Sequence, residues 1–591
     1  MTNKFKKNEW NLGLLYSSIN DKQIEKDMTS LENLCEDFNK KYATADRKFL
    51  TDKKELVESL EKFFYIDGID GLLTPKPIMF LTFTIHKDSS NIKAQSLLNL
   101  MNNRATKALN KLAFYYIDLG KISINKQSEF LSDPQLAKYK FFLTCVFSDA
   151  KYNLSEAEER IMNLKSLPAS QMWDIGHNKI LTSVTIKWKG KDIPLAQAQG
   201  MVGESNKKNR DSLSGLIATE LKKISVFSEA EMNALVTNKK IDDELRGYTR
   251  PYDDTIRRYR NDPKTVEKLV EIVTKSFNVP QKFYKLKAKL LKLKTLSYSD
   301  RSAKYAKVNG DFPFESSIKS LTKTFGNFDS KYSEILKNYI KNGQIDVYAK
   351  KGKMGGAYCW GTFQTPTFVL LNHTNSLHSY LTIAHEMGHA FHTELSKPQG
   401  PIYSSYSFSL AETASTFFES LAFEEIVESL PEKQRVIALH NQIDDDISTI
   451  FRQVACFNFE NDIHNIVRKN GYISKEELAD LHNKNMKAYL GPVFKMNHDD
   501  GYSFVQWWHI RQFFYVYSYA YGQLVSKALL RRYKKDKGFI KSIEKFLSAG
   551  GKDTPENILK EIGIDVTSGQ LFQEGIDQIA EDIKRLERLI K

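Results

Sequence analysis

The stretch His385-Glu386-Met387-Gly388-His389 constrains this chain more than any other. Its flanks, from Leu381 to Phe391, are apolar or small, which is typical of a buried helix. On a helix, residues i and i+4 lie on one face about one turn apart, so the two histidines can bind one ion. Burying these polar groups without a partner would be costly. The pattern therefore predicts a metal site on a buried helix.

A His-Glu-x-x-His helix is the signature of zinc peptidases, in which two histidines bind the ion and the glutamate is a general base. Such a zinc ion needs a third protein ligand. The metzincin pattern requires glycine three residues and histidine six residues after the second histidine, where this chain has His392 and Leu395. His392 is expected to be a core or groove histidine, because about 10 Å of helix separates it from His385.

The other source of a third ligand is a glutamate on a following helix. Apolar residues recur at helical spacing from Leu410 to Ile426, and the segment 396–409 has the proline, glycine and serine content of a loop. Two antiparallel helices joined by this loop would bring Glu412 to the metal; a solvated surface glutamate is the alternative. Glu419 follows two turns later on the same face and could orient a ligand histidine.

Several stretches together resemble the oligoendopeptidase F group of the thimet oligopeptidase family. The resemblance runs nearly from end to end and is carried by Trp10-Asn11-Leu12, 355–359, 385–392, 410–419, 509–519, 549–551 and Pro555. It implies a mainly α fold with two lobes around a deep substrate groove. It also implies one zinc ion per chain and internal cleavage of short peptides.

Periodicity independently predicts helices over most of the chain, including 21–42, 52–64, 91–119 and 571–590. Two short strands, 344–348 and 367–371, flank a glycine-rich stretch just before the metal helix. We therefore expect a mainly α fold with a small β-sheet next to that helix. The polar segment 200–214 is the expected boundary between an N-terminal helical lobe, 1–200, and a catalytic region, 201–591.

The small sheet could pair its open edge with the main chain of an extended peptide, although a purely structural hairpin fits the pattern equally well. The resemblance favours substrate binding at Gly356, Ala357 and Tyr358.

Peptide hydrolysis creates an oxyanion, which needs hydrogen-bond donors besides zinc. The late segment 503–530 offers His509 together with Tyr515, Tyr517 and Tyr519. The resemblance implies that His509 and one tyrosine serve this task, and we favour Tyr515, with Tyr517 next.

The composition indicates a cellular compartment and excludes some classes of binding partner. Four scattered cysteines among 591 residues indicate no disulfide framework and a reducing compartment. No signal-peptide pattern and no run of 18 apolar residues occurs, so we expect a cytoplasmic protein without a membrane partner. The net charge is +14, but the lysine clusters have the pattern of solvated helix faces and no nucleic-acid-binding motif accompanies them. Nucleic acid is therefore not an expected partner.

These observations predict a zinc-dependent endopeptidase that hydrolyses internal bonds of short unstructured oligopeptides, with Glu386 activating a zinc-bound water. A related zinc carboxypeptidase or dipeptidase acting on peptide ends is the first alternative. A non-catalytic peptide- or nucleic-acid-binding protein is the second, and the intact set of His385, Glu386, His389 and Glu412 argues against it.

Overall fold

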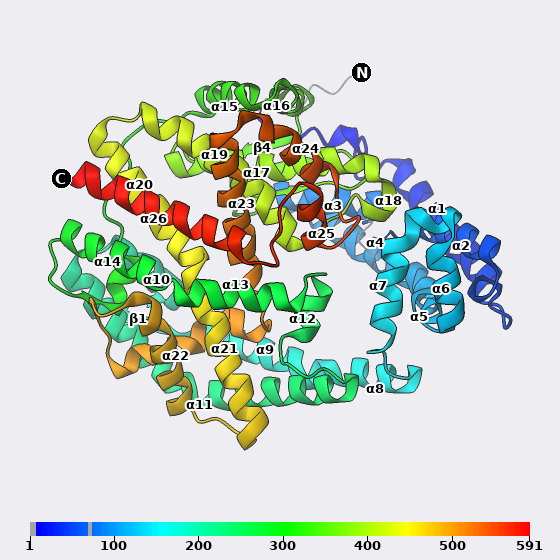
Figure 1. Ribbon diagram of the computed structural model, residues 1–591, viewed down its shortest axis with the longest axis horizontal. Helices are drawn as coiled ribbons and strands as arrows, with labels where there is room; N and C mark the ends of the chain where they lie inside the picture. The colour runs from blue at the N-terminus through cyan, green and yellow to red at the C-terminus, as the bar shows by residue number, and fades with distance from the viewer. Residues whose placement is uncertain (1–7, 69–73) are drawn as a thin grey trace. The chain divides into compact units, whose positions relative to one another are not determined.

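The structure is a computed structural model that describes residues 8–68 and 74–591. Helices dominate the described part, and its strands are short, which confirms the predicted mainly α class (Figure 1). The chain forms two compact units, each assembled from three segments. Unit 1 comprises residues 1–151, 310–425 and 533–562, and unit 2 comprises 152–309, 426–532 and 563–591.

The N-terminal part of unit 1 is a helical bundle. Its core is aromatic, with Phe38, Phe63 and Tyr115 packed at ring separations of 5.0 to 6.1 Å. Its helices are α1 (Lys22–Tyr42), α2 (Lys53–Ile66), α3 (Lys76–Lys87), α4 (Ile92–Leu109), α5 (Ala113–Leu119), α6 (Ile124–Ser132) and α7 (Lys140–Ala150). The helices expected at 21–42 and 52–64 are confirmed.

The single helix expected over 91–119 is wrong. A 3-10 turn, η3 (Asn110–Leu112), separates α4 from α5. No glycine or proline marks this break. Leu112 and Tyr115 are both buried in the aromatic core, so tertiary packing rather than local sequence accounts for the change of direction.

The rest of unit 1 surrounds a three-stranded sheet in the order β4-β6-β5. Strand β6 (Phe368–His373) pairs in parallel with β4 (Ile345–Tyr348) and in antiparallel with β5 (Tyr358–Trp360). The sheet predicted before the metal helix is thus present, with an additional strand, β5. α17 (Leu377–Ser396) packs against this sheet, and the other helices of this part of the unit are α15 (Phe314–Phe328), α16 (Ser330–Asn342), α18 (Gly400–Tyr403), α19 (Phe408–Ser429), α24 (Ile540–Ser548) and α25 (Pro555–Glu561).

Unit 2 is built around the long helix α11 (Lys207–Arg246), which can be followed along the lower part of Figure 1. The hairpin β1 (Thr185–Trp188) and β2 (Lys191–Pro194) was not predicted. The short strands β3 (Leu296–Ser297) and β7 (Phe494–Lys495) pair in parallel. The remaining helices are α8 (Glu156–Ser166), α9 (Met172–Ser183), α10 (Leu195–Glu204), α12 (Asp253–Arg258), α13 (Pro263–Lys275), α14 (Asn278–Leu290), α20 (Glu432–Thr449), α21 (Phe451–Asn470), α22 (Lys475–Leu490), α23 (Tyr517–Lys535) and α26 (Gln570–Ile590).

The lobe boundary that we expected at 200/201 falls inside α10, and the division into 1–200 and 201–591 stays a prediction. The four cysteines are free. Within the described ranges, no helix combines the length and apolar character that crossing a bilayer requires.

Candidate metal centre

Helix α17 positions the predicted metal ligands. It begins directly after strand β6, where Ser376 caps its first turn by accepting a hydrogen bond from the backbone N–H of Ser379 at 3.2 Å. Its apolar side chains, among them Ile383, Met387 and Phe391, are fully buried. Because these residues fix the rotation of the helix, His385 and His389 share the remaining face.

Helix α19 lies against α17 at Gly388. A Cβ atom at this position would lie 2.6 Å from Ser415 Cα and 3.0 Å from the carbonyl oxygen of Ala414. Only glycine lets the two backbones approach this closely. On the same helix pair, Phe391 and Phe418 pack at a ring separation of 4.8 Å. The close contact brings Glu412, one turn before Ser415, to the two histidines.

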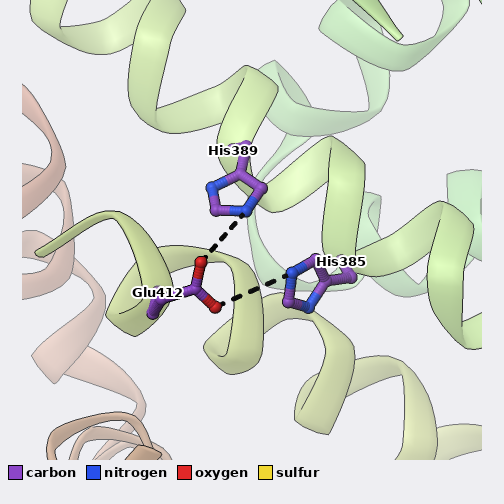
Figure 2. A group of neighbouring side chains, drawn as sticks. All are labelled: His385, His389 and Glu412. Carbon is purple, nitrogen blue, oxygen red and sulfur yellow. Dashed lines mark ion pairs between the residues drawn. The ribbon is translucent and has the colours of Figure 1, made fainter. Parts of the chain in front are cut away.

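The three predicted ligands converge (Figure 2). His385 Nε2 lies 4.0 Å from Glu412 Oε2, and His389 Nε2 lies 3.9 Å from Glu412 Oε1. One donor atom from each of the three residues falls within 4.8 Å of the others. Two imidazole nitrogens and a carboxylate oxygen are a donor set that catalytic zinc sites use. The side chains present therefore fit a zinc ion with three protein ligands.

Glu419 orients the first histidine. Its Oε2 lies 2.8 Å from His385 Nδ1, so that hydrogen bond leaves Nε2 of the same ring facing Glu412. A carboxylate behind a ligand imidazole fixes the tautomer and the ring orientation and raises the basicity of the ligand. The role that we expected for Glu419 matches this geometry.

Glu386 lies beside the ligands but is not one of them. Its side chain is buried, and its Oε2 has no hydrogen-bond partner within the described residues. Burial raises the pKa of Glu386 to about 7; the neighbouring His385 opposes this shift, and other carboxylates nearby add to it. A buried polar atom without a partner is rare in a folded protein and calls for a functional explanation.

His392 belongs to the core, as expected. Its ring stacks on Tyr406 with a centroid distance of 3.5 Å and an interplanar angle of 7°. Burial lowers its pKa to about 3, so the imidazole is neutral. It takes no part in the three-residue metal cluster.

Of the predicted substrate residues, Gly356 and Ala357 precede β5 and Tyr358 is its first residue, at an edge of the sheet. α17 packs against both β5 and β6. The backbone N–H of Val347, on β4, donates a hydrogen bond to the carbonyl oxygen of Asn8 at 3.0 Å. The segment at Asn8 therefore occupies the β4 edge of the sheet. The Gly356 carbonyl accepts a hydrogen bond from Asn372 Nδ2 at 2.7 Å, and its φ of +78° favours glycine. Tyr358 instead turns its hydroxyl to His86 Nδ1, at 2.7 Å.

The predicted oxyanion donors belong to unit 2. His509 lies in the 3-10 helix η9 (Trp508–Arg511), and its Nδ1 forms a short hydrogen bond with the Tyr515 hydroxyl. Burial, followed by the charge of Arg452, lowers the pKa of His509 to about 4. Tyr517 is fully buried and donates to Asn261 Oδ1 at 3.0 Å. The structure thus pairs His509 with Tyr515 and engages Tyr517 elsewhere.

A strained backbone and two long-range contacts in this segment were missed from the sequence. Phe513 and Phe514 have φ angles of 48° and 59°, and such left-handed backbone in bulky residues is strained. The carboxylate of Glu460 accepts from the Phe514 backbone N–H at 2.8 Å. Arg511 makes a buried bidentate ion pair with Glu231, both contacts at 2.7 Å. No local sequence pattern predicts either contact, because Glu460 and Glu231 lie far along the chain from the residues they bind.

Comparisons with known proteins agree with this geometry. The family model described as peptidase family M3 matches residues 218–578, and one described as oligopeptidase F matches 118–185. An oligoendopeptidase F homolog of Borreliella burgdorferi is 24% identical over 98% of both chains. Oligopeptidase PepF of Bacillus subtilis is 24% identical over 85% of this chain and 77% of its own length.

Solved structures share the fold. A Chlamydophila abortus protein aligns with a TM-score of 0.87, 22% identity and 98% coverage of both chains. Oligoendopeptidase F of Enterococcus faecium aligns with a TM-score of 0.69 and 16% identity, covering 96% of this chain and 99% of its own. The M3 family model spans more than half of the sequence and includes the helix pair that carries the three ligands. This chain belongs to peptidase family M3.

Proposed function

We propose that this metallo-oligopeptidase is a zinc-dependent endopeptidase that hydrolyses internal bonds of short, unstructured peptides. The observation that carries the proposal is the convergence of His385, His389 and Glu412 beside the unpartnered carboxylate of Glu386. The full-length similarity to proteins named oligoendopeptidase F supports the preference for short peptides and internal bonds.

His385, His389 and Glu412 would hold one zinc ion, which when bound supplies Lewis acidity that polarises a carbonyl and acidifies a water molecule. Glu386 accepts the proton of the attacking water and delivers it to the leaving amine. Its Oε2 is available for this exchange because no side chain or backbone group of the described chain forms a hydrogen bond with it. Glu419 keeps His385 in the orientation that ligation requires.

The open edge of β5 supports main-chain binding of substrate. In an antiparallel or parallel pairing, a peptide exchanges backbone hydrogen bonds with the edge and needs no particular side chain. We assign Gly356 and Ala357 to this task through their backbones. Tyr358 contributes through its backbone alone, since its hydroxyl is bonded to His86. Such binding requires an extended peptide, which a folded protein does not offer.

We propose that His509 and Tyr515 are the oxyanion donors, following the family resemblance. Their mutual hydrogen bond places the two groups side by side but uses one of their two protons, because neutral His509 has one N–H and Tyr515 one O–H. Both can donate to the oxyanion only when that bond opens. A kinetic comparison tests it: Tyr515→Phe and His509→Ala should lower kcat with little change in KM, because the donors act on the transition state. Tyr517→Phe is the matched control. Full activity of Tyr515→Phe alongside an inactive Tyr517→Phe would reverse the assignment.

Digestion of peptides blocked at both ends tests the central proposal. A series of increasing length, acetylated and amidated, should be cut internally by the zinc-loaded enzyme and not by Glu386→Gln. A stable folded protein should survive the same incubation. Complete dependence on a free amino or carboxyl terminus would instead establish an exopeptidase, and rapid digestion of the folded protein would refute the restriction to unstructured chains.

A further inference from the structure

Unit 2 contains a cavity with a polar and aromatic lining. This cavity of about 290 Å³ lies among α10, α11, α21, α22 and the 3-10 helices η6 (Tyr298–Ser302) and η8 (His498–Gln506). All of its lining residues belong to unit 2, and none belongs to the unit that carries the metal ligands. Its polar and aromatic lining includes Tyr298, Ser299, Arg301, Arg452, His482 and Trp507.

Two arginines in this lining have no anionic partner among the residues that the structure describes. Within the described ranges, Arg301 and Arg452 form no side-chain hydrogen bond and no ion pair, and the Nε of each is buried without a partner. The buried arginines Arg511 and Arg210 of this unit are paired with Glu231 and Asp300, at 2.7 Å. Arg301 and Arg452 are only partly buried, but burying even part of a guanidinium without an anion is costly, so their lack of a partner requires an explanation.

Aromatic rings hold both guanidinium groups in place. Arg301 Cζ lies 5.2 Å from the ring centroid of Tyr298, and Arg452 Cζ lies 4.9 Å from that of Trp507. A cation–π contact uses the flat face of the guanidinium and leaves the N–H groups at its edge free. The arginines are therefore fixed in position while their donors remain available.

Further donors face the same cavity. The indole Nε1 of Trp507 and both ring nitrogens of His482 are buried without hydrogen-bond partners in the described structure. Burial, then the charges of Arg452 and Arg301, lower the pKa of His482 to about 3, so the ring is neutral and one nitrogen can donate.

The nearby carboxylates do not neutralise the arginines. Asp444 is engaged by Lys287, whose Nζ lies 2.9 Å from Oδ2. Asp500, at the cavity wall, accepts the backbone N–H of Asn497 at 2.7 Å. The cavity consequently keeps an excess of positive charge and of unused donors.

We propose that this cavity binds the oxyanion group, phosphate or carboxylate, of a small molecule, with Arg301 and Arg452 as its charged donors. Arginine recognises both groups through two parallel N–H···O bonds. The volume is at the lower end of ligand pockets, which suits a small anion rather than a peptide. The proposal is independent of the peptidase assignment, because it uses none of the catalytic residues.

Calorimetric titration of the zinc-loaded full chain with inorganic phosphate, and separately with succinate, tests the proposal. At least one should bind, and the one that binds identifies phosphate or carboxylate as the preferred group. Arg301→Gln and Arg452→Gln should each weaken binding at least about tenfold, the scale of one lost charge-assisted hydrogen bond. Lys294→Gln is the matched control, since it removes one charge from an exposed residue that does not line the cavity.

Fluorescence supplies a readout that needs no arginine variant. Binding should change the emission of the wild-type protein, and Trp507→Phe should abolish that change. Absence of binding by both anions would overturn the proposal, as would equal weakening in Lys294→Gln. Phosphate bound at the metal centre would keep its affinity in both arginine variants and lose it after zinc removal, which would equally refute the cavity site. If a glutamine variant does not fold, Arg301→Lys keeps the charge, removes the bidentate geometry and should still weaken binding.

Discussion

Gly388→Ala should damage the metal centre without touching a ligand. The added Cβ would lie 2.6 Å from Ser415 Cα, whereas non-bonded carbon atoms prefer about 3.5–4.0 Å. Helix α19 must therefore move by about 1 Å. Glu412 lies on that helix one turn earlier, and metal–ligand distances tolerate only about 0.2 Å. The displaced carboxylate would ligate poorly, and we expect zinc affinity to fall by about 10–100-fold, the range seen when ligand orientation is lost.

Stability should fall as well. Overpacking a well-filled contact typically costs about 1–3 kcal/mol. Replacing glycine by alanine inside a helix would otherwise gain up to about 1 kcal/mol. Gly215→Ala measures that gain alone, because position 215 lies in α11 and a Cβ there meets nothing within 4 Å.

Two measurements test whether the Gly388 contact sets the position of Glu412. Competition with a chelator gives the zinc affinity, and thermal unfolding of the metal-free proteins gives the stability. Gly388→Ala should lose both affinity and stability, whereas Gly215→Ala should lose neither. Unchanged zinc affinity in Gly388→Ala would refute the argument that this close contact sets the position of Glu412. Lost affinity with unchanged stability would show that the helices adjust without strain.

Three further outcomes follow from the contacts. Glu386→Gln should retain zinc by elemental analysis and lose at least about a hundredfold in kcat, the scale of a lost acid–base group; near-normal turnover would remove its role. Glu419→Gln should weaken zinc binding by about tenfold or more in chelator competition, because it replaces the carboxylate that holds a ligand imidazole. Acid should destabilise the fold through His482, whose pKa of about 3 lies below its unfolded value, so that the unfolded state alone binds a proton as pH falls below about 6.5. The loss that His482 contributes at pH 5 is about 2 kcal/mol, and His482→Phe should reduce the slope of the unfolding free energy between pH 7 and pH 5 by about one proton, while His392 and His509 keep their own contributions.

The convergence of the predicted ligands was foreseeable because most of the information for it is local. A spacing of four residues puts His385 and His389 on one helix face in any helix, and the apolar flanks decide which face is buried. Glu412 required one more step, the pairing of two helices across the segment 396–409. That segment, expected to be a loop, contains the 3-10 helix η7 (Lys397–Gln399) and α18, yet Glu412 still reaches the two histidines. Gly388, the residue that permits their contact, gave no signal of its function in the sequence.

Features that depend on distant partners were not predictable. Strand β5 needs β6 as its template, and the break after α4 needs the aromatic core around Tyr115. The unpaired state of Arg301 and Arg452 is a property of tertiary placement, since each is 151 positions from the other along the chain. A sequence shows which charges exist, but only the fold shows which of them lack a partner.

The charges around the metal centre indicate what kind of ion belongs there. Glu386, Glu412 and Glu419 surround His385 at a mostly buried position. Burial works against protonation of His385, but the hydrogen bond from Glu419 and the charges of Glu386 and Glu412 outweigh it and raise the pKa of His385 to about 9. The carboxylates therefore favour a positive charge at this position, and a proton supplies it when no metal is bound. A cation held by His385, His389 and Glu412 would compete with that proton, so we expect metal affinity to rise with pH. Glu386 meanwhile keeps an Oε2 that no group in the described residues occupies. The carboxylates that favour a cation among the three predicted ligands thus include one with an oxygen free to accept a proton.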